Sequence, residues 1–202
     1  MASAAAPVQQ ATDALAVKIV IAGGFGVGKT TFVSAVSDIG ALTTDVTMTV
    51  AGQDVDDLSL VPDKKTTTVA FDFGRVDLGE IRLYLFGTPG QTRFWFMWDS
   101  AVRGALGAVV LADTRRLADS FAAIDYFEHR QLPYIVVVNQ FDGAREHSVA
   151  DLRDALAIDP EVPLLACDAR VRDGVKRVLI ELVEHLIQLR DLRRIAAANH
   201  PL

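Results

Sequence analysis

The chain has 202 residues, of which half are hydrophobic and 23% are charged, as is typical of one folded domain. Its net charge of −6 argues against nucleic acid or an anionic membrane as the main partner, since both require a basic face. The chain contains neither a membrane-spanning apolar run nor a second cysteine beside Cys167, so we expect a soluble cytoplasmic protein without an intrachain disulfide or a cysteine-based zinc site.

The predicted elements begin with a strand, a glycine-rich loop and a helix. Residues 16–22 form a mostly apolar run of strand length, and residues 30–37 have a helical pattern. Residues 38–67 are polar, rich in threonine and aspartate, and irregular, which predicts a long loop.

The later elements alternate between strands and helices. Strands over 69–76 and 81–86 around the turn at 77–80 predict a β-hairpin. Further strands are predicted over 104–112, 134–138 and 162–166, and helices over 117–129, over 149–158 after the capping residue Ser148, and from about 173 onward.

This alternation predicts an α/β fold with a mostly parallel six-stranded sheet, one antiparallel edge hairpin and helices on both faces. We expect one domain over 15–195, with tails over 1–14 and 196–202. Ligands of such folds bind at the carboxyl ends of the strands, and the motifs below all follow predicted strands.

A phosphate-binding loop is predicted over residues 23–30, whose sequence GGFGVGKT fits the pattern G-x-x-x-x-G-K-[ST] in full. Its glycines let the backbone N–H groups curl onto phosphate oxygens, and the next helix adds its positive end. We expect Lys29 to reach the β- and γ-phosphates and the Thr30 hydroxyl to coordinate Mg²⁺. The predicted nucleotide-binding residues of this loop are Gly23, Gly26, Val27, Gly28, Lys29, Thr30 and Thr31.

A base-recognition segment follows the strand at 134–138. Asn139, Gln140 and Asp142 stand where small GTPases carry Asn-Lys-x-Asp. The Asp142 carboxylate could accept two N–H donors from guanine, a pairing that adenine does not offer, while Asn139 would brace the loop. Gln140 replaces the lysine whose stem packs over the base, so we expect some loss of affinity.

A second turn of this kind follows the strand at 162–166. Asp168, Ala169 and Arg170 occupy the place of a Ser-Ala-Lys-like turn, in which the Ala169 N–H would face the guanine oxygen. The alternative interpretation of both base segments is ordinary turn chemistry without a ligand.

The first predicted switch segment contains Thr68, four residues before Asp72, a spacing typical of switch I in small GTPases. We predict Thr68 as the second hydroxyl ligand of Mg²⁺. Thr66 and Thr67 leave the register open, and a threonine-rich strand entry is the alternative.

The second switch segment is FGTPGQ at residues 86–91. Gly90 would give its N–H to the γ-phosphate, and Gln91 would orient the attacking water. Gly87 stands where an aspartate normally organises Mg²⁺, so we expect weaker Mg²⁺ binding and slow hydrolysis.

Two further features of this region have open interpretations. Arg75, Arg93 and Arg103 are candidates to supply transition-state charge, and the sequence does not choose among them. The run FWFMW at 94–98 is either core packing or a partner surface.

Several segments together resemble the actinobacterial conservon GTPases, which are relatives of the bacterial polarity switch MglA. These segments are GGFGVGKTTF (23–32), DKKTTTVAFDFG (63–74), LFGTPGQ (85–91), FWFMW (94–98) and DTRRLA (113–118). The resemblance implies a Ras-like P-loop GTPase fold and a roadblock-type protein as regulator. It also implies a sensor-kinase-like membrane protein and a small domain of unknown function as neighbours and, in one branch, a pentapeptide-repeat protein that acts on DNA gyrase.

Three functions remain open from the sequence. The leading hypothesis is a GTP/GDP switch with slow hydrolysis, in which Gln91 and Lys29 are catalytic. The second is a nucleotide-holding scaffold that does not hydrolyse GTP. The third is an ATP-using P-loop kinase or ATPase, in which Asp113, at the end of an apolar strand, would bind Mg²⁺.

Overall fold

The computed structural model describes residues 14–40, 42–49, 66–90, 97–145 and 147–198, without the side chains of residues 42–49, 66–70 and 196. The strands are β1 (Leu15–Gly23), β2 (Leu42–Thr49), β3 (Thr66–Leu78), β4 (Ile81–Gly87), β5 (Gly107–Ala112), β6 (Tyr134–Asn139) and β7 (Leu164–Cys167). The helices are α1 (Lys29–Val36), α2 (Trp98–Val102), the 3₁₀ helix η2 (Thr114–Ser120), α3 (Phe121–His129), α4 (Val149–Leu156) and α5 (Arg172–Ala198).

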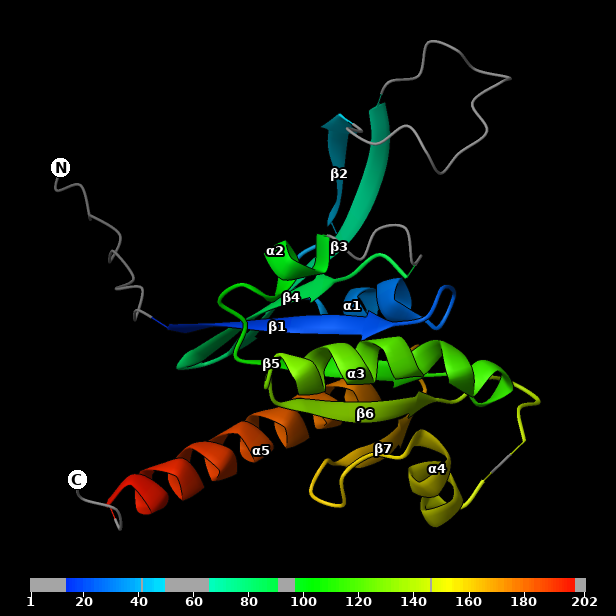
Figure 1. Cartoon of the computed structure of the whole chain (residues 1–202). Helices are drawn as coiled ribbons and strands as arrows, with labels where there is room; N and C mark the ends of the chain where they lie inside the picture. Colours follow the sequence, from blue (N-terminus) through cyan, green and yellow to red (C-terminus); the bar gives the residue numbers. More distant parts are fainter. Residues whose placement is uncertain (1–13, 41, 50–65, 91–96, 146, 199–202) are drawn as a thin grey trace, which may run out of the picture.

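Within these described residues the strands form one seven-stranded sheet in the order β2-β3-β4-β1-β5-β6-β7. Strand β3 runs antiparallel to β2 and β4, and the other neighbouring pairs are parallel. Helices lie on both faces of the sheet (Figure 1). The predicted α/β class, the mostly parallel sheet and the two-sided helix cover are confirmed.

The predicted count of six strands is wrong, because β2 lies in the segment that was expected to be a loop. Strand β2 pairs with β3 from Leu42↔Phe73 to Thr49↔Thr66. Its threonines are β-branched and favour strands, although their polarity made the segment resemble a loop. The β3–β4 hairpin is therefore internal, and β2 forms the sheet edge on an arm that extends away from the helices (Figure 1).

The central strand β1 is buried on both sides, as its alternating residues show. Ile19 and Ile21 belong to the core that α1 and α5 cover. Val20 and Ala22 belong to the core on the other face, with residues of α2, α3 and α4. A strand buried on both faces fixes the position of the loop at its carboxyl end.

Local differences from the predicted elements have local causes. The helix expected over 117–129 is 3₁₀ up to Ser120, as the end of η2, and α-helical from Phe121, where α3 begins. Just before it, Arg116 has non-helical backbone angles that interrupt η2. Strand β5 begins after Gly104, whose φ of 75° forms a turn. Ser148 caps α4 as predicted, since its side chain accepts a hydrogen bond from the Asp151 N–H.

The long helix α5 covers the sheet with the apolar stripe that the sequence indicates. The residues of α5 that are buried in this core are Val175, Val178, Leu179 and Leu182. Across the described part of the chain, no helix combines the length and hydropathy that a membrane span requires.

Candidate nucleotide-binding site

The glycine-rich loop joins the end of β1 to the start of α1, at the carboxyl edge of the sheet. Gly28 has a φ of 105°, and a Cβ atom there would lie 2.6 Å from the Asn139 amide nitrogen. Only glycine combines that backbone conformation with so close a neighbour. Val27 is buried and anchors the loop to the core.

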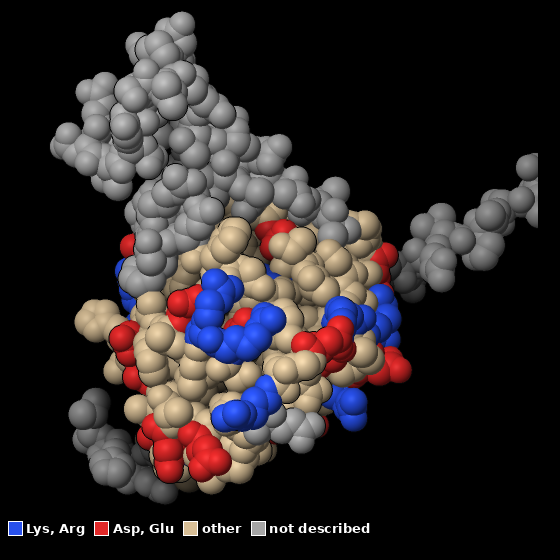
Figure 2. Space-filling view, turned by 90° about the vertical axis from the view of Figure 1, so that its right-hand side faces the viewer, with Lys and Arg blue, Asp and Glu red and all other residues tan. Residues whose placement is uncertain are grey.

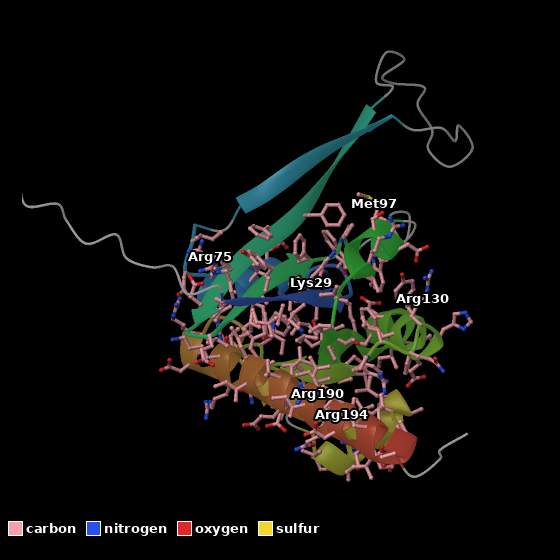
Figure 3. The ribbon with its side chains drawn as sticks, turned by 90° about the vertical axis from the view of Figure 1, so that its left-hand side faces the viewer. Lys29, Arg75, Met97, Arg130, Arg190 and Arg194 are labelled. Atoms are coloured by element: carbon pink, nitrogen blue, oxygen red, sulfur yellow. The ribbon has the colours of Figure 1, made fainter. Side chains whose placement is uncertain are left out.

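Lys29 is a buried cation at the centre of this loop. Its Nζ atom donates hydrogen bonds to the carbonyl oxygens of Gly23, at 3.0 Å, and Gly24, at 2.7 Å. Burial lowers the pKa of Lys29 to about 8, and the charge of Asp72 partly offsets this effect. Figure 3 shows Lys29 in the interior of the molecule, well apart from Arg75. An ammonium that is poorly solvated and held by carbonyl oxygens is well placed to receive an anion.

The lowered pKa of Lys29 predicts a pH dependence of nucleotide binding. Below about pH 8 the ammonium is charged in the free protein, so GDP affinity should be nearly constant between pH 7 and about pH 8. Bound phosphates would raise this pKa, so binding takes up a proton at higher pH, and affinity should fall by up to about tenfold per pH unit.

Fluorescence titrations of GDP between pH 7 and 9 check this expectation. The control variant is Lys29→Arg, whose guanidinium does not titrate in this range and should therefore lack the decline. An equal decline in both proteins would contradict the assignment to Lys29.

Thr30 contacts a carboxylate that the sequence analysis did not include among the site residues. The Thr30 hydroxyl donates a hydrogen bond of 2.7 Å to Oδ2 of Asp72 on β3. Asp72 is the direct partner of Gly87 in the β3–β4 register. A Cβ atom at Gly87 would lie 2.9 Å from the Asp72 Cβ and 3.0 Å from its Oδ2. The Asp72 carboxylate therefore occupies the space beside Gly87 where an aspartate was expected.

These oxygens fit the requirements of a magnesium site. Mg²⁺ prefers hydroxyl and carboxylate oxygens, and it usually retains several waters. Thr30 is exposed and Asp72 is half-buried, so both can be reached from solvent. Thr68 lies on the same strand as Asp72 and pairs with Thr47, but its side chain lies outside the described residues.

The second switch segment packs directly on the glycine-rich loop. The Thr88 N–H donates to the Ile21 carbonyl oxygen at 2.9 Å, and the Pro89 carbonyl accepts from the Trp98 indole at 3.3 Å. A Cβ atom at Gly90 would lie 2.6 Å from the Lys29 Nζ. Gly90 thus brings its backbone close to Lys29.

The rest of that segment is only partly described. Gln91 and residues 92–96 lie outside the described residues. Met97 and Trp98 are buried, so core packing is the correct interpretation for these two members of the aromatic run.

Asn139 connects three segments that are far apart in the sequence. Its amide nitrogen donates to the Val27 carbonyl at 2.8 Å, and its amide oxygen accepts from the Ala169 N–H at 3.0 Å. The side chain is buried, so these bonds tie the phosphate loop to the turns after β6 and β7. The Ala169 N–H, which was expected to face a guanine oxygen, is directed to Asn139 instead.

Asp142 and Asp168 share one arginine. Arg170 donates to both oxygens of Asp142, at 2.8 and 2.9 Å, and to both oxygens of Asp168, at 2.8 to 3.2 Å. These hydrogen bonds hold the pKa of both carboxyls below the ordinary aspartate value. Gln140 is exposed beside this group. The predicted base-recognition residues are therefore brought together at the carboxyl ends of β6 and β7.

The structure brings an arginine to the phosphate loop that the sequence analysis did not consider. Arg116 donates from Nη2 to the Phe25 carbonyl at 2.8 Å. By contrast, Arg75 pairs with Asp77, and the Arg103 carbonyl accepts from Lys18 near the start of β1. Arg93 lies outside the described residues. Arg116 also has non-helical backbone angles within η2.

Asp113 is engaged by its neighbour Arg115 rather than by the phosphate loop. The Arg115 side chain donates to both Asp113 oxygens at 2.7 to 3.2 Å, and its N–H donates at 2.9 Å. These bonds cap η2 and lower the pKa of Asp113. The contact to the Thr30 hydroxyl is made by Asp72, which argues against Asp113 as the magnesium ligand.

Figure 2 faces the edge of the molecule where the β1, β5 and β6 strands end. Lysine and arginine side chains gather near the centre of this face, with aspartate and glutamate side chains interspersed. A mixed surface of this kind provides cations for phosphates and carboxylates for a base or a metal within one face.

Comparisons with known proteins give a family and several relatives of this chain. Residues 21–189 match the family described as "Conserved hypothetical ATP binding protein". The chain is 26% identical over 174 residues to an uncharacterized protein of Methanocaldococcus jannaschii, covering 84% of this chain and 96% of that protein. It is 28% identical over 148 residues to the Ras-related protein Rab-18-B of Danio rerio, covering 68% of each.

Comparison with solved structures identifies the fold of this chain. The G domain of the FeoB iron transporter of T. maritima superposes with a TM-score of 0.60 at 18% identity, covering 84% of this chain and 98% of that one. A likeness at this identity concerns the fold of the chain. The chain thus belongs to the family described as conserved hypothetical ATP binding proteins, and it has the Ras-like fold of P-loop GTPases.

Proposed function

We propose that this protein is a guanine-nucleotide switch that binds GTP and GDP with Mg²⁺ and hydrolyses GTP slowly. The observation that carries the proposal is the pair of hydrogen bonds made by Asn139, to Val27 and to Ala169. They hold the phosphate loop and the Asp142 turn in one unit, so a single ligand could reach both. A nucleoside phosphate could do so, with its phosphates at the loop and its base at Asp142.

The proposed choice of guanine rests on Asp142. Its carboxylate already accepts two parallel N–H donors, from Arg170, and the guanine edge offers two such donors. Adenine offers no matching pair, because the ring nitrogen beside its amino group is an acceptor. Relatives named as Ras-related proteins add support.

The alternative is ATP, which the printed description of the family names. A guanine-reading carboxylate beside the phosphate loop does not favour adenine. The aspartate that the ATP-using hypothesis required, Asp113, is bound to Arg115. We therefore keep ATP as the second candidate, and comparison of the two nucleotides is the deciding test.

In the proposed site Mg²⁺ would be held by the hydroxyls of Thr30 and Thr68, with Asp72 accepting from Thr30 or from bound water. The ion would supply positive charge to the β- and γ-phosphate oxygens. Lys29 would donate to those same oxygens once it leaves the Gly23 and Gly24 carbonyls. The Gly90 N–H would add a further donor.

Hydrolysis would depend on Gln91, which we propose as the residue that orients water. We expect slow release of phosphate from GTP by the purified protein. Gln91→Ala should decrease it by at least about tenfold, because misplacement of a reacting group can cost up to about 100-fold. Phosphate release is measured in a coupled assay with excess Mg²⁺. Equal release by both proteins, at background level, would favour the scaffold that holds nucleotide without turnover.

Arg116 is the described arginine that contacts the phosphate loop, so it replaces Arg75 and Arg103 as a candidate for transition-state charge. Arg93, which lies outside the described residues, stays a candidate beside it. Partners are proposed from the sequence resemblance to the MglA-like conservon GTPases alone. A roadblock-type protein is the proposed regulator, and the neighbouring sensor-kinase-like membrane protein and pentapeptide-repeat protein are the further proposed partners. The proposed location of this chain is the cytoplasm.

A further inference from the structure

Arg170 occupies the two oxygens of Asp142 on which the proposed guanine recognition depends. Its Nη1 donates to Oδ2 at 2.8 Å, and its Nη2 donates to Oδ1 at 2.9 Å. This is the bidentate geometry in which a guanidinium binds a carboxylate most strongly.

Guanine and the arginine side chain present the same donors to such a carboxylate. The N1–H and the exocyclic amino group of guanine are attached to one carbon, so this edge of the base is itself a guanidine fragment. A carboxylate accepts one such fork in its plane through both oxygens. Guanine and Arg170 therefore cannot occupy Asp142 in this way at the same time.

Asp168 is a second partner that Arg170 can keep when its hydrogen bonds to Asp142 break. The arginine Nε and Nη2 atoms donate to the Asp168 oxygens at 2.9 and 2.8 Å. The Arg170 N–H also donates to Asp168 at 2.9 Å, which holds that carboxylate in place. Arg170 can therefore release Asp142 while it keeps its second ion pair, so the displacement requires little energy.

The exposure of the Asp142 and Arg170 side chains indicates how much their ion pair can change guanine affinity. The side chain of Asp142 is 85% exposed and that of Arg170 is 53% exposed, so water replaces the broken hydrogen bonds. Exposed ion pairs contribute little to free energy. We expect the competition to change guanine affinity by about two- to fivefold, consistent with that range.

We propose that Arg170 is a built-in competitor of guanine for Asp142 and that it lowers the guanine affinity and the preference for guanine over adenine. The inference rests on the proposed function, because it takes Asp142 as the residue that reads the base. Adenine makes no bidentate pair with Asp142, so it binds without displacing Arg170. Arg170 thus acts as a specificity-determining residue.

The test is the change of GDP and ADP affinity in Arg170→Met, measured by isothermal titration of the full chain in excess Mg²⁺. GDP should bind about two- to fivefold tighter than in the wild type, with ADP affinity unchanged. Arg170→Lys, which keeps the charge without the bidentate fork, should lie between the two. The charge-matched control is Arg177→Met, an exposed arginine farther along α5, which should leave both affinities unchanged.

Asp142→Asn separates failure of this inference from failure of the proposed function. In the Asp142→Asn background, Arg170→Met should no longer tighten GDP binding. If Asp142→Asn weakens GDP binding but Arg170→Met leaves it unchanged or weaker, the competition is overturned and the guanine switch stands. If Asp142→Asn leaves GDP affinity unchanged, the guanine switch itself is overturned, and the competition with it.

Discussion

Substituting Lys29 by alanine should reduce the affinity for GDP and GTP by about 100-fold or more. The Lys29 ammonium is buried and has two carbonyl acceptors within 3.0 Å. When phosphates replace those carbonyls, each hydrogen bond joins opposite charges and contributes about 1.5–3 kcal/mol. Two such bonds give the expected loss, which is measured as Kd by fluorescence titration.

The same substitution should leave the fold intact. Burial lowers the pKa of Lys29, which means that the charged form is held there at a free-energy cost. Removal of the charge should therefore not lower the thermal unfolding midpoint of the free protein. Lys18→Ala is the matched control, because this lysine lies on the same strand–helix unit but bonds to the Arg103 carbonyl. A Lys29→Ala protein that keeps wild-type GDP affinity would contradict the phosphate-binding role.

Removal of the Asp72 carboxylate should weaken the response to Mg²⁺, and an aspartate at position 87 should restore it. Asp72→Ala should weaken Mg²⁺ binding in the GDP complex by about 10- to 100-fold, as expected for residues that orient metal ligands. The Asp72→Gly/Gly87→Asp double variant should recover most of this loss, because the two positions are directly opposite in the sheet and glycine at position 72 removes the Cβ that would lie 2.9 Å from the new one. GDP affinity is measured along a Mg²⁺ titration, with EDTA as the zero point.

Gly87→Asp alone provides the control for that exchange. Its new Cβ would lie 2.9 Å from the Asp72 Cβ, so the two carboxylates would be crowded and the protein should be less stable by about 1–3 kcal/mol. Thermal unfolding checks this value. If Asp72→Ala responds to Mg²⁺ as the wild type does, Asp72 does not organise the metal site.

The phosphate loop could be predicted from the sequence because its residues are close together in the chain. The pattern at 23–30 specifies its own geometry, and Lys29, Thr30 and the strand before them are found where it requires. The strand at 134–138 was also predictable, since a fully apolar run indicates a strand buried on both faces. Asn139 and Asp142 follow directly from its end.

The role of Asp72 could not be found in the same way, because it depends on pairing between strands. Asp72 and Gly87 are fifteen positions apart and meet only through the β3–β4 register. A register assignment for the hairpin around Gly79 would have revealed the pair. Strand β2 was missed because its threonine-rich sequence is polar, and its pairing with β3 outweighs that polarity.

Arg116 and Arg170 show a further limit of sequence interpretation. Both are exposed arginines, and the sequence indicates at most their local pairing with Asp119 and Asp168. The contact of Arg116 with Phe25 joins η2 to the glycine-rich loop. That of Arg170 with Asp142 joins turns after two different strands, so both require the folded chain.

The preference for GDP over ADP depends on the phosphate loop and on Asp142 together, so its measurement tests whether this protein binds guanine nucleotides through both. Competition of each nucleotide against fluorescent GDP gives the ratio of the two Kd values for the wild type and for Asp142→Asn. We predict that the wild type binds GDP at least about 100-fold tighter than ADP, and that Asp142→Asn reduces this preference by about tenfold or more, as expected when a charged hydrogen-bond acceptor is lost. Equal or tighter binding of ADP by the wild type would contradict it.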